Sequence, residues 1–152
     1  MEDLRIQHMK VGDRFVTPAR MVTRTEIENF CAATGMKLPV FASDEWVKSS
    51  KEHQALGLKG SIAPGQFAMA IFLGNLIGAG LLDDVIVQLG TDKVKYLAPV
   101  YPYDMLRTEI EIIGSRVSKS GTQVIVDYKW AVKNQNDVIV EQGENTCMFK
   151  NV

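Results

Sequence analysis

The side chains that could transfer a proton at neutral pH are few in this chain. Its two histidines are His8 and His53. His53 lies in a charged segment with Asp44 and Glu52, and a carboxylate beside an imidazole would make a general base. A charged segment more often forms a solvated helix face, so we expect His53 to be a surface residue. His8 lies in a polar segment outside every motif, and we assign it no function.

For the other residues that could carry chemistry, the sequence pattern also favours structural roles. Cys31 and Cys147 are isolated thiols without the spacing of a zinc site or a disulfide framework, which favours buried structural cysteines. Asp83, Asp84 and Asp92 could suggest a cation site, but they lack the alternating ligand spacing of calcium sites. We expect them to be solvated turn residues, and the sequence indicates neither a metal nor another cofactor.

Composition and sequence pattern argue against phosphate and nucleic acid as ligands. Gly74, Gly78 and Gly80 could mark a phosphate loop, but the lysine and hydroxyl residue of that motif are absent, which favours helix packing or termination. The 17 basic residues nearly balance 18 acidic ones, and no basic stripe could neutralise a nucleic-acid backbone. We therefore expect no nucleic-acid partner.

The chain has the size and hydrophobicity of one domain. Its 152 residues, 46% of them apolar, can bury a continuous core, so residues 1–152 are expected to form a single domain. Residues 1–10 are polar and do not resemble a secretory signal, which favours a cytoplasmic location. The most apolar stretch, 67–82, is short and interrupted by glycines, which predicts a buried helix rather than a membrane span.

Local signals predict the elements that precede this apolar stretch. A short strand is expected at 14–17, and residues 23–26 have the spacing of a helix capping box. That helix should end at Gly35, which favours a left-handed conformation. Residues 36–41 are expected to be extended because of the proline among them, and a charged, exposed helix should cover 44–55.

A helix that is apolar nearly all round should follow, with Pro64 at its first position and its end near Ile77. Such a helix must be wrapped by other structure, and strands are available for this. They are expected at 85–97, 105–117, 122–133 and 137–148. Turn-forming links at 118–121 and 134–137 predict an antiparallel meander. The predicted fold is α+β, a hot-dog fold with a long antiparallel sheet around a central apolar helix.

Two segments resemble the MaoC-like dehydratases and (R)-specific enoyl-CoA hydratases. Leu58-Lys59-Gly60-Ser61-Ile62-Ala63-Pro64-Gly65 resembles the glycine-rich start of the central helix in that family. Tyr96-Leu97-Ala98-Pro99-Val100-Tyr101-Pro102-Tyr103-Asp104 resembles its aromatic-proline-valine-aspartate turn. Together with the strand order, the resemblance extends over nearly the whole chain, and it implies chemistry on enoyl or hydroxyacyl thioesters.

The acid/base loop of that family is not kept in this sequence. The resemblance places an aspartate and a histidine in a loop that here reads Met36-Lys37-Leu38-Pro39-Val40-Phe41, so Met36 replaces the aspartate and Phe41 the histidine. Neither side chain can carry a proton, so no catalytic residues are expected at these positions. A thioether and an aromatic ring would suit an acyl chain instead.

The start of the central helix remains suited to a thioester. Free amides near Gly65 and Gln66, at the positive end of the helix dipole, could hold a thioester carbonyl. The residues expected to bind the thioester are Ile62, Ala63, Gly65, Gln66, Met36 and Phe41. The side chains of Met69, Ile71, Phe72, Leu73 and Leu76 could line an acyl tunnel or fill the core.

Three functions remain open on this basis. The first is a non-catalytic subunit that binds an acyl-CoA or acyl carrier protein thioester and pairs with a catalytic hot-dog chain. Such silent subunits resemble this sequence at 58–65 and 121–126. The second is an enzyme, either a hydratase or dehydratase that uses displaced residues or a thioesterase in which Asp44, Glu45 or His53 activates water. The third is a homodimeric acyl-CoA sensor. Each implies a homodimer or heterodimer, because the sheet leaves an open edge.

Overall fold

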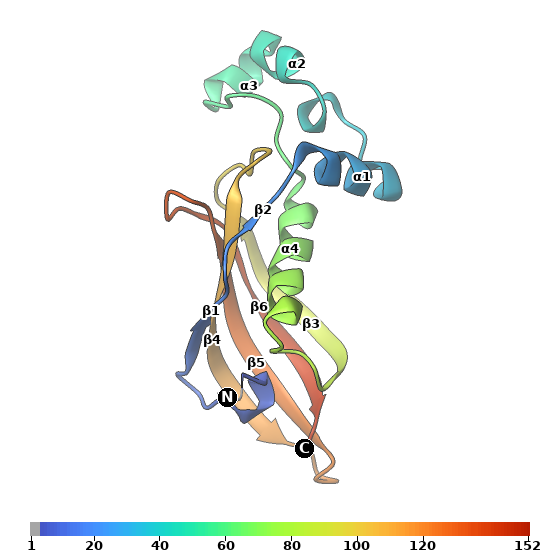
Figure 1. The fold of residues 1–152 in the computed structure, drawn as a ribbon, viewed down its shortest axis with the longest axis vertical. Coiled ribbons are helices and arrows are strands. Elements are labelled where there is room, and N and C mark those ends of the chain that lie inside the picture. Colours follow the sequence, from blue (N-terminus) through green and yellow to red (C-terminus); the bar gives the residue numbers. More distant parts are fainter. Residues whose placement is uncertain (1–3) are drawn as a thin grey trace.

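The computed structural model describes residues 4–152, so the first three residues of the polar 1–10 segment lie outside the described part. It confirms the α+β hot-dog fold, in which a curved antiparallel sheet packs against one long helix (Figure 1). The strands are β1 (Arg14–Val16), β2 (Arg20–Met21), β3 (Val85–Tyr96), β4 (Met105–Val117), β5 (Gln123–Lys133) and β6 (Ile139–Lys150).

The sheet has the order β1-β4-β5-β6-β3, and β2 also pairs with β4. The expected meander holds for β4, β5 and β6. Gly121 and Asp137, both with positive φ, make the turns of the two hairpins, as the turn chemistry predicted. The strand before the meander, β3, does not pair with its successor β4 but crosses to the far side and pairs with β6. This makes β3 an edge strand.

The shorter helices largely follow their expected boundaries. The helix α1 (Arg24–Thr34) has the predicted capping box at Thr23 and Glu26 and ends at a left-handed Gly35. The expected extended loop 36–41 instead closes in a 3-10 turn, η2 (Pro39–Phe41). Another 3-10 turn, η1 (Ile6–His8), lies near the N-terminus.

The single helix expected at 44–55 is two helices, α2 (Asp44–Ser49) and α3 (Lys51–Ala55). Ser50 separates them because its extended backbone and its side chain, which accepts from the His53 amide, begin a new helix. Figure 1 shows α1, α2 and α3 projecting beyond one end of the sheet. We call residues 24–59 the overhang.

The central helix α4 (Gly65–Gly78) runs along the concave face of the sheet (Figure 1). Its start differs slightly from expectation, since Pro64 precedes the helix as its N-cap rather than occupying its first turn. The Phe72 ring stacks on Trp130 of β5, with centroids 4.0 Å apart and an interplanar angle of 9°. On the other side of Trp130 lies Gly143 of β6, where an added Cβ would come within 2.6 Å of the indole.

The strands leave one side of α4 open, which agrees with a helix expected to be wrapped on most sides. Within the described chain, a stripe of α4 at Gln66, Ala70, Gly74 and Ile77 stays exposed. The strand β3 is also exposed along nearly its full length, including three apolar residues that are 46–50% exposed. These are Ile86, Val87 and Leu89. An apolar helix stripe and an apolar edge strand are therefore left open together.

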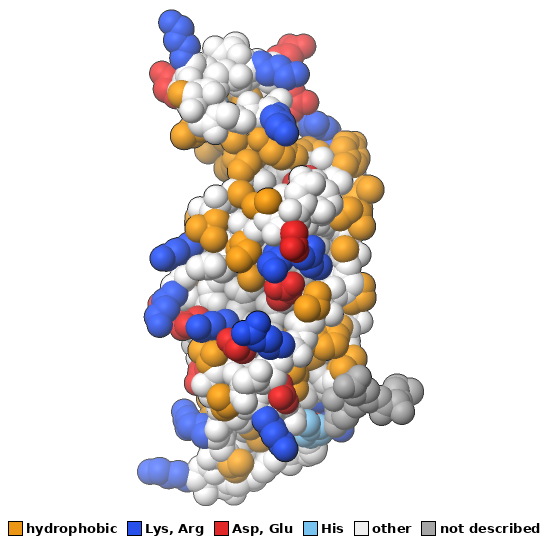
Figure 2. Space-filling model, turned by 90° about the vertical axis from the view of Figure 1, so that its left-hand side faces the viewer, with side chains coloured by type: hydrophobic (Ala, Val, Ile, Leu, Met, Phe, Trp, Pro, Cys, Tyr) orange, Lys and Arg blue, Asp and Glu red, His pale blue; other side chains and the backbone are white. Residues whose placement is uncertain are grey.

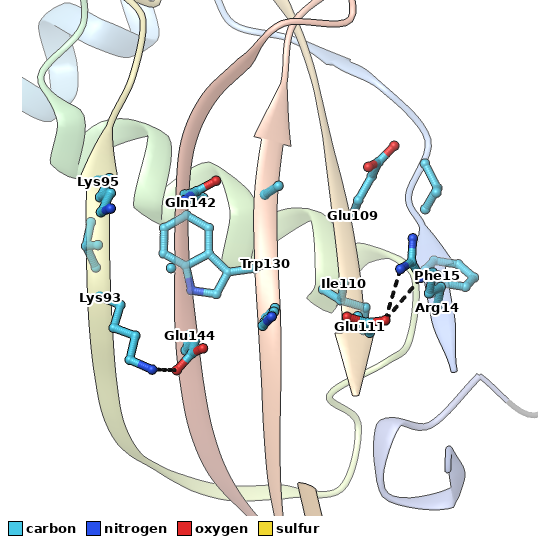
Figure 3. A pocket seen from close by; sticks show the side chains of 15 residues that line it. Arg14, Phe15, Lys93, Lys95, Glu109, Ile110, Glu111, Trp130, Gln142 and Glu144 are labelled. Atoms are coloured by element: carbon cyan, nitrogen blue, oxygen red, sulfur yellow. Dashed lines mark hydrogen bonds and ion pairs between the residues drawn. The ribbon is translucent and has the colours of Figure 1, made fainter. Parts of the chain in front are cut away.

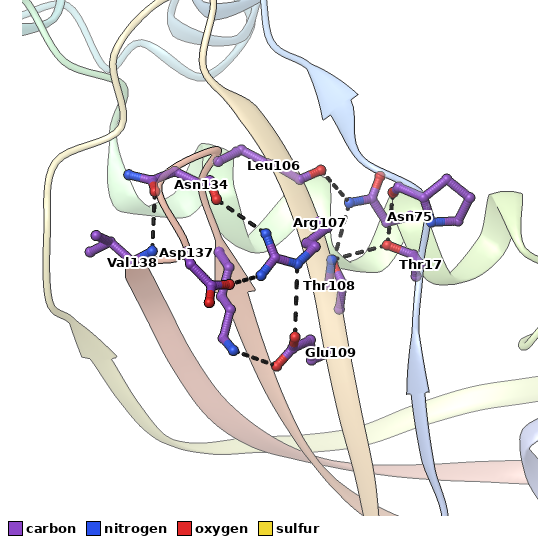
Figure 4. A network of polar contacts seen from close by, with 11 residues as sticks. Thr17, Asn75, Leu106, Arg107, Thr108, Glu109, Asn134, Asp137 and Val138 are labelled. Atoms are coloured by element: carbon purple, nitrogen blue, oxygen red, sulfur yellow. Dashed lines mark hydrogen bonds and ion pairs between the residues drawn. The ribbon is translucent and has the colours of Figure 1, made fainter.

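Polar contacts fix α4 to the sheet at its C-terminal half. The Asn75 amide donates to the Leu106 carbonyl and to the Thr108 hydroxyl of β4, each at 3.3 Å (Figure 4). The Thr108 amide donates to the Thr17 hydroxyl at 3.0 Å. In the same view Arg107 binds Asp137 in the next hairpin. These contacts set the height of the helix over the sheet.

Candidate functional site

The start of α4 is held by backbone hydrogen bonds from both sides. The Ile62 amide donates to the Val40 carbonyl at 3.0 Å, which joins this segment to the 36–41 loop. The Ala63 amide donates to the Val100 carbonyl at 2.8 Å, which joins it to the turn after β3. Two segments distant in sequence therefore meet at the first turn of the helix.

That first turn offers unpaired amide groups. Pro64 supplies no side-chain cap. Neither the Gly65 nor the Gln66 amide makes a hydrogen bond within the described residues, as the first turn of an α-helix leaves them free. The Tyr96 ring lies directly over Gly65, where a Cβ would come within 2.2 Å of it. A glycine is therefore needed for the Tyr96 ring to approach the helix start so closely.

The loop 36–41 brings apolar side chains to this region. Met36 and Phe41 are both partly buried and pack against the core. The neighbouring Phe30 of α1 meets Phe67 of α4 edge to face, with centroids 5.5 Å apart. The loop therefore contributes two apolar side chains to the core, and Met36 and Phe41 provide no proton donor or acceptor.

Asp44, a candidate base, has a structural role. Its Oδ1 accepts from the Ser61 amide at 2.8 Å and from the Ser61 hydroxyl at 2.9 Å, and its Oδ2 accepts from Arg24 at 3.3 Å. These hydrogen bonds from Ser61, with Arg24, lower the pKa of Asp44 below its ordinary value. A carboxylate held in this way is a weaker base, and it fixes the overhang to the segment before α4. The adjacent Glu45 is exposed.

His53 is partly buried, which corrects the expectation of a fully solvated residue. Its Nδ1 lies 2.6 Å from the Ser50 hydroxyl, and its ring meets Trp46 edge to face at 4.8 Å. Both contacts are internal to the α2–α3 pair. His53 therefore stabilises the overhang through Ser50 and Trp46.

Sequence reasoning missed Glu141 of β6. Its side chain is 1% exposed, and its Oε1 has no hydrogen-bond partner among residues 4–152. Burial raises the pKa of Glu141 to about 8, so its carboxyl group is mostly protonated at neutral pH. In register, Glu141 lies between Val132 of β5 and Tyr96 of β3, the residue whose ring covers Gly65.

A separate groove of about 710 Å³ crosses the outer face of the sheet, away from α4 (Figure 3). Oppositely charged residues alternate across it from strand to strand, beginning with Arg14 on Glu111 at 3.0 Å and ending with Lys93 on Glu144 at 3.4 Å. Lys129 lies between the two glutamates in register. The groove is lined by both basic and acidic residues and by none of the residues expected to bind a thioester.

Other expected features also have structural positions. Cys31 and Cys147 are buried free thiols, as predicted. Asp84 binds the Arg5 and Gln7 side chains rather than being a purely solvated turn residue. Among residues 4–152, no group of three or more candidate side chains could hold a metal ion, and no helix is long and apolar enough to cross a membrane.

The surface at the junction of overhang and sheet is apolar. Figure 2 shows hydrophobic side chains gathered in a band below the overhang, whereas charged side chains are spread over the sheet beneath it. Large apolar residues that remain exposed in the segments meeting at this end include Leu38, Leu56, Tyr96, Leu97 and Tyr103. The free amides of α4 therefore have apolar surface near them.

Comparison with known proteins identifies the family. Residues 7–134 match the model of the MaoC-like domain. The chain belongs to the MaoC-like dehydratase family. It is 25% identical over 148 residues to protein YdeM of Bacillus subtilis, covering 97% of this chain and 99% of that one.

Two solved structures illustrate the shared MaoC-like fold. The (R)-hydratase PhaJ1 of Pseudomonas aeruginosa superposes with a TM-score of 0.76 at 19% identity, over 98% of this chain and 87% of that one. A chain of the HadBC (3R)-hydroxyacyl-ACP dehydratase complex of Mycobacterium tuberculosis gives 0.67 at 23% identity, over 97% and 98%. Both are more than 75% different in sequence, so the likeness concerns the fold.

Proposed function

We propose that this MaoC-like chain binds an acyl thioester, carried by CoA or acyl carrier protein, at the start of α4. The unpaired amides of Gly65 and Gln66 hold the thioester carbonyl at the positive end of the helix dipole. The observation that carries this proposal is the combination of those free amides with an apolar wall from Met36 and Phe41. The same wall removes the acid and base from their family positions, so the chain does not hydrate enoyl thioesters through them.

We further propose that the chain works as a dimer, either with itself or with a catalytic hot-dog subunit. The open edge of β3 and the exposed stripe of α4 are supporting features, because a second sheet edge would cover both. The HadBC assembly is a complex of this kind of fold. In a mixed pair, the partner would supply the acid/base residues that Met36 and Phe41 do not.

The first experiment combines ligand-induced thermal stabilisation with an assay for hydration. The protein is mixed with crotonyl-CoA and with a longer trans-enoyl-CoA, while enoyl absorbance and Tm are followed. Ligand that binds the folded state raises Tm, and we expect a rise of a few degrees at saturating ligand without loss of absorbance. Rapid hydration would overturn the silent-subunit proposal, and no stabilisation by either ligand would overturn thioester binding.

A matched pair of variants locates the site. In Gly65→Ala the new methyl group displaces the Tyr96 ring, whereas Gly74→Ala on the same helix meets open space. We expect the Tm shift caused by the ligand to shrink in Gly65→Ala and to persist in Gly74→Ala. Equal shifts in both variants would place the ligand elsewhere.

A further inference from the structure

The groove on the outer face of the sheet contains one row of side chains with a very small residue near its middle. In register, the row that crosses the strands consists of Val16, Glu109, Ala131, Gln142 and Lys95. All five line the groove of about 710 Å³, a volume in the range of pockets that bind small molecules (Figure 3). Ala131 presents only a methyl group between two long side chains, so it leaves room that a longer residue would fill.

Every acidic residue that lines the groove is already paired with a basic one. The pairs are Glu111 with Arg14 at 3.0 Å, Glu144 with Lys93 at 3.4 Å, and Glu109 with Lys133 at 2.9 Å. Two lysines of the lining, Lys95 and Lys129, are exposed and have no ion-pair or hydrogen-bond partner among residues 4–152. The Gln142 side chain also has none within that part of the chain. The charge that remains uncompensated in the groove is therefore positive.

The two unpaired lysines lie on either side of β6. Lys95 of β3 is the register partner of Gln142, and Lys129 of β5 is the register partner of Glu144, the next outward-facing residue of β6. From the spacing of strands and of residues along them, the Cα atoms of Lys95 and Lys129 are about 12 Å apart. Two extended lysine side chains can close that distance from opposite sides. An anion above β6 can therefore meet both ammonium groups and the Gln142 amide.

These groups suit a phosphate better than a carboxylate. A phosphate monoester carries a charge of about −2 near neutral pH, which equals the charge of the two lysines. Beside them, Ala131 and the 50% exposed Val16 offer apolar surface along the same row. The sequence argued against phosphate because it lacks a glycine-rich phosphate loop. The groove uses side-chain cations instead, which the sheet brings together from strands far apart in the sequence.

We propose that the outer groove binds a small soluble organic phosphate. The phosphate group lies above β6 between Lys95 and Lys129, where it accepts hydrogen bonds from both ammonium groups and from the Gln142 amide. The organic part extends along the row over Ala131 toward Val16. The groove is on the face of the sheet opposite to α4, so this inference does not depend on the proposed thioester site.

The test is calorimetric titration at low ionic strength with adenosine monophosphate, adenosine and inorganic phosphate. We expect adenosine monophosphate to bind more tightly than inorganic phosphate, and adenosine to show no binding. Lys95→Gln and Lys129→Gln should each weaken the binding of adenosine monophosphate by about threefold to tenfold, because each removes one charged hydrogen-bond donor. Ala131→Leu fills the space beside Gln142 and should weaken the binding of adenosine monophosphate but not of inorganic phosphate.

Lys119→Gln provides a matched control, because Lys119 is exposed in the turn between β4 and β5, does not line the groove, and its replacement changes the net charge equally. It should leave the affinity unchanged, and an equal loss in this variant would mean that the protein attracts anions without a site. The inference is also wrong if adenosine monophosphate does not bind, or binds no more tightly than adenosine or inorganic phosphate. Binding to phosphatidic acid vesicles but not to adenosine monophosphate would overturn it in favour of a membrane contact.

Discussion

At the scale of single residues, two carboxyl groups of this chain have opposite environments. Asp44 accepts hydrogen bonds from Ser61 and Arg24, which lower its pKa, whereas desolvation raises the pKa of Glu141 to about 8. Asp44 is therefore ionised and structural at neutral pH, and Glu141 is mostly neutral. Their effects on stability consequently depend on pH in opposite directions.

Glu141→Gln should remove a pH-dependent destabilisation. The folded-state pKa of about 8 exceeds the ordinary value of 4.5, so the stability associated with the bound proton is full below pH 4.5 and is lost as pH rises toward 8. Between pH 4 and pH 7 this loss is on the order of 3 kcal/mol. Urea unfolding of the native protein and of Glu141→Gln at several pH values measures the difference. Parallel pH profiles would show that Glu141 ionises normally.

The burial of Glu141 could not be predicted from the sequence, and the reason lies in the local structure of β6. A strict alternation starting from Val140 would put Gln142 on the buried face and Glu141 on the solvent face. The register shift between β5 and β6 near Ile139 makes Val140 and Glu141 buried together. By contrast, the assignment of Met36 and Phe41 to the acid/base positions of the family rests on the resemblance around Pro39 and stays a prediction.

At the scale of elements, predictions succeeded where one short motif determines the structure. The capping box at Thr23 and the left-handed Gly35 fix both ends of α1, and the turn residues fix the hairpins of the meander. Predictions failed where local signals compete, or where contacts between distant segments determine the structure. Ser50 ends one helix and begins the next, and nothing in β3 itself encodes its pairing with β6.

Gly143→Ala should destabilise the protein by about 1–3 kcal/mol, the range of an overpacked core. The new methyl group would come within 2.6 Å of Trp130, and that indole cannot retreat because Phe72 is stacked on its other face. Gly90→Ala on β3 is the control, because an added methyl group there meets nothing within 4 Å. Thermal unfolding of both variants measures the contrast, and equal losses would show that the stack has room to move.

At the scale of the whole molecule, one chain leaves its central helix partly uncovered. The α4 stripe is exposed, and so is β3, which is the strand at one margin of the sheet. The family and fold followed from sequence order and motifs. The extent of the uncovered surface did not, since it depends on how far the sheet curves around α4.

Leu89→Lys should weaken the proposed dimer. Leu89 is 50% exposed on the β3 edge, and a lysine there would place a charge at the centre of a strand-to-strand contact. Val117→Lys is a suitable control, because Val117 is 57% exposed at the end of β4, away from that edge. Sedimentation over a range of concentrations should show a shift toward monomer in Leu89→Lys only. A native protein that is monomeric at all concentrations, without a partner chain, would contradict the dimer.

The pairing of β3 with β6 also determines when the sheet can be completed during protein synthesis. The ribosome makes α4 and β3 first, but the strand that holds β3 in the sheet is β6, which follows all the other strands in sequence. Until β6 has been released, β3 has no strand to pair with inside the chain, and α4 lies on an incomplete sheet. Such non-local pairing is slow and leaves strand edges prone to aggregation. The nascent chain should therefore depend on chaperones until its last strand emerges, and truncation within β6 should leave it insoluble.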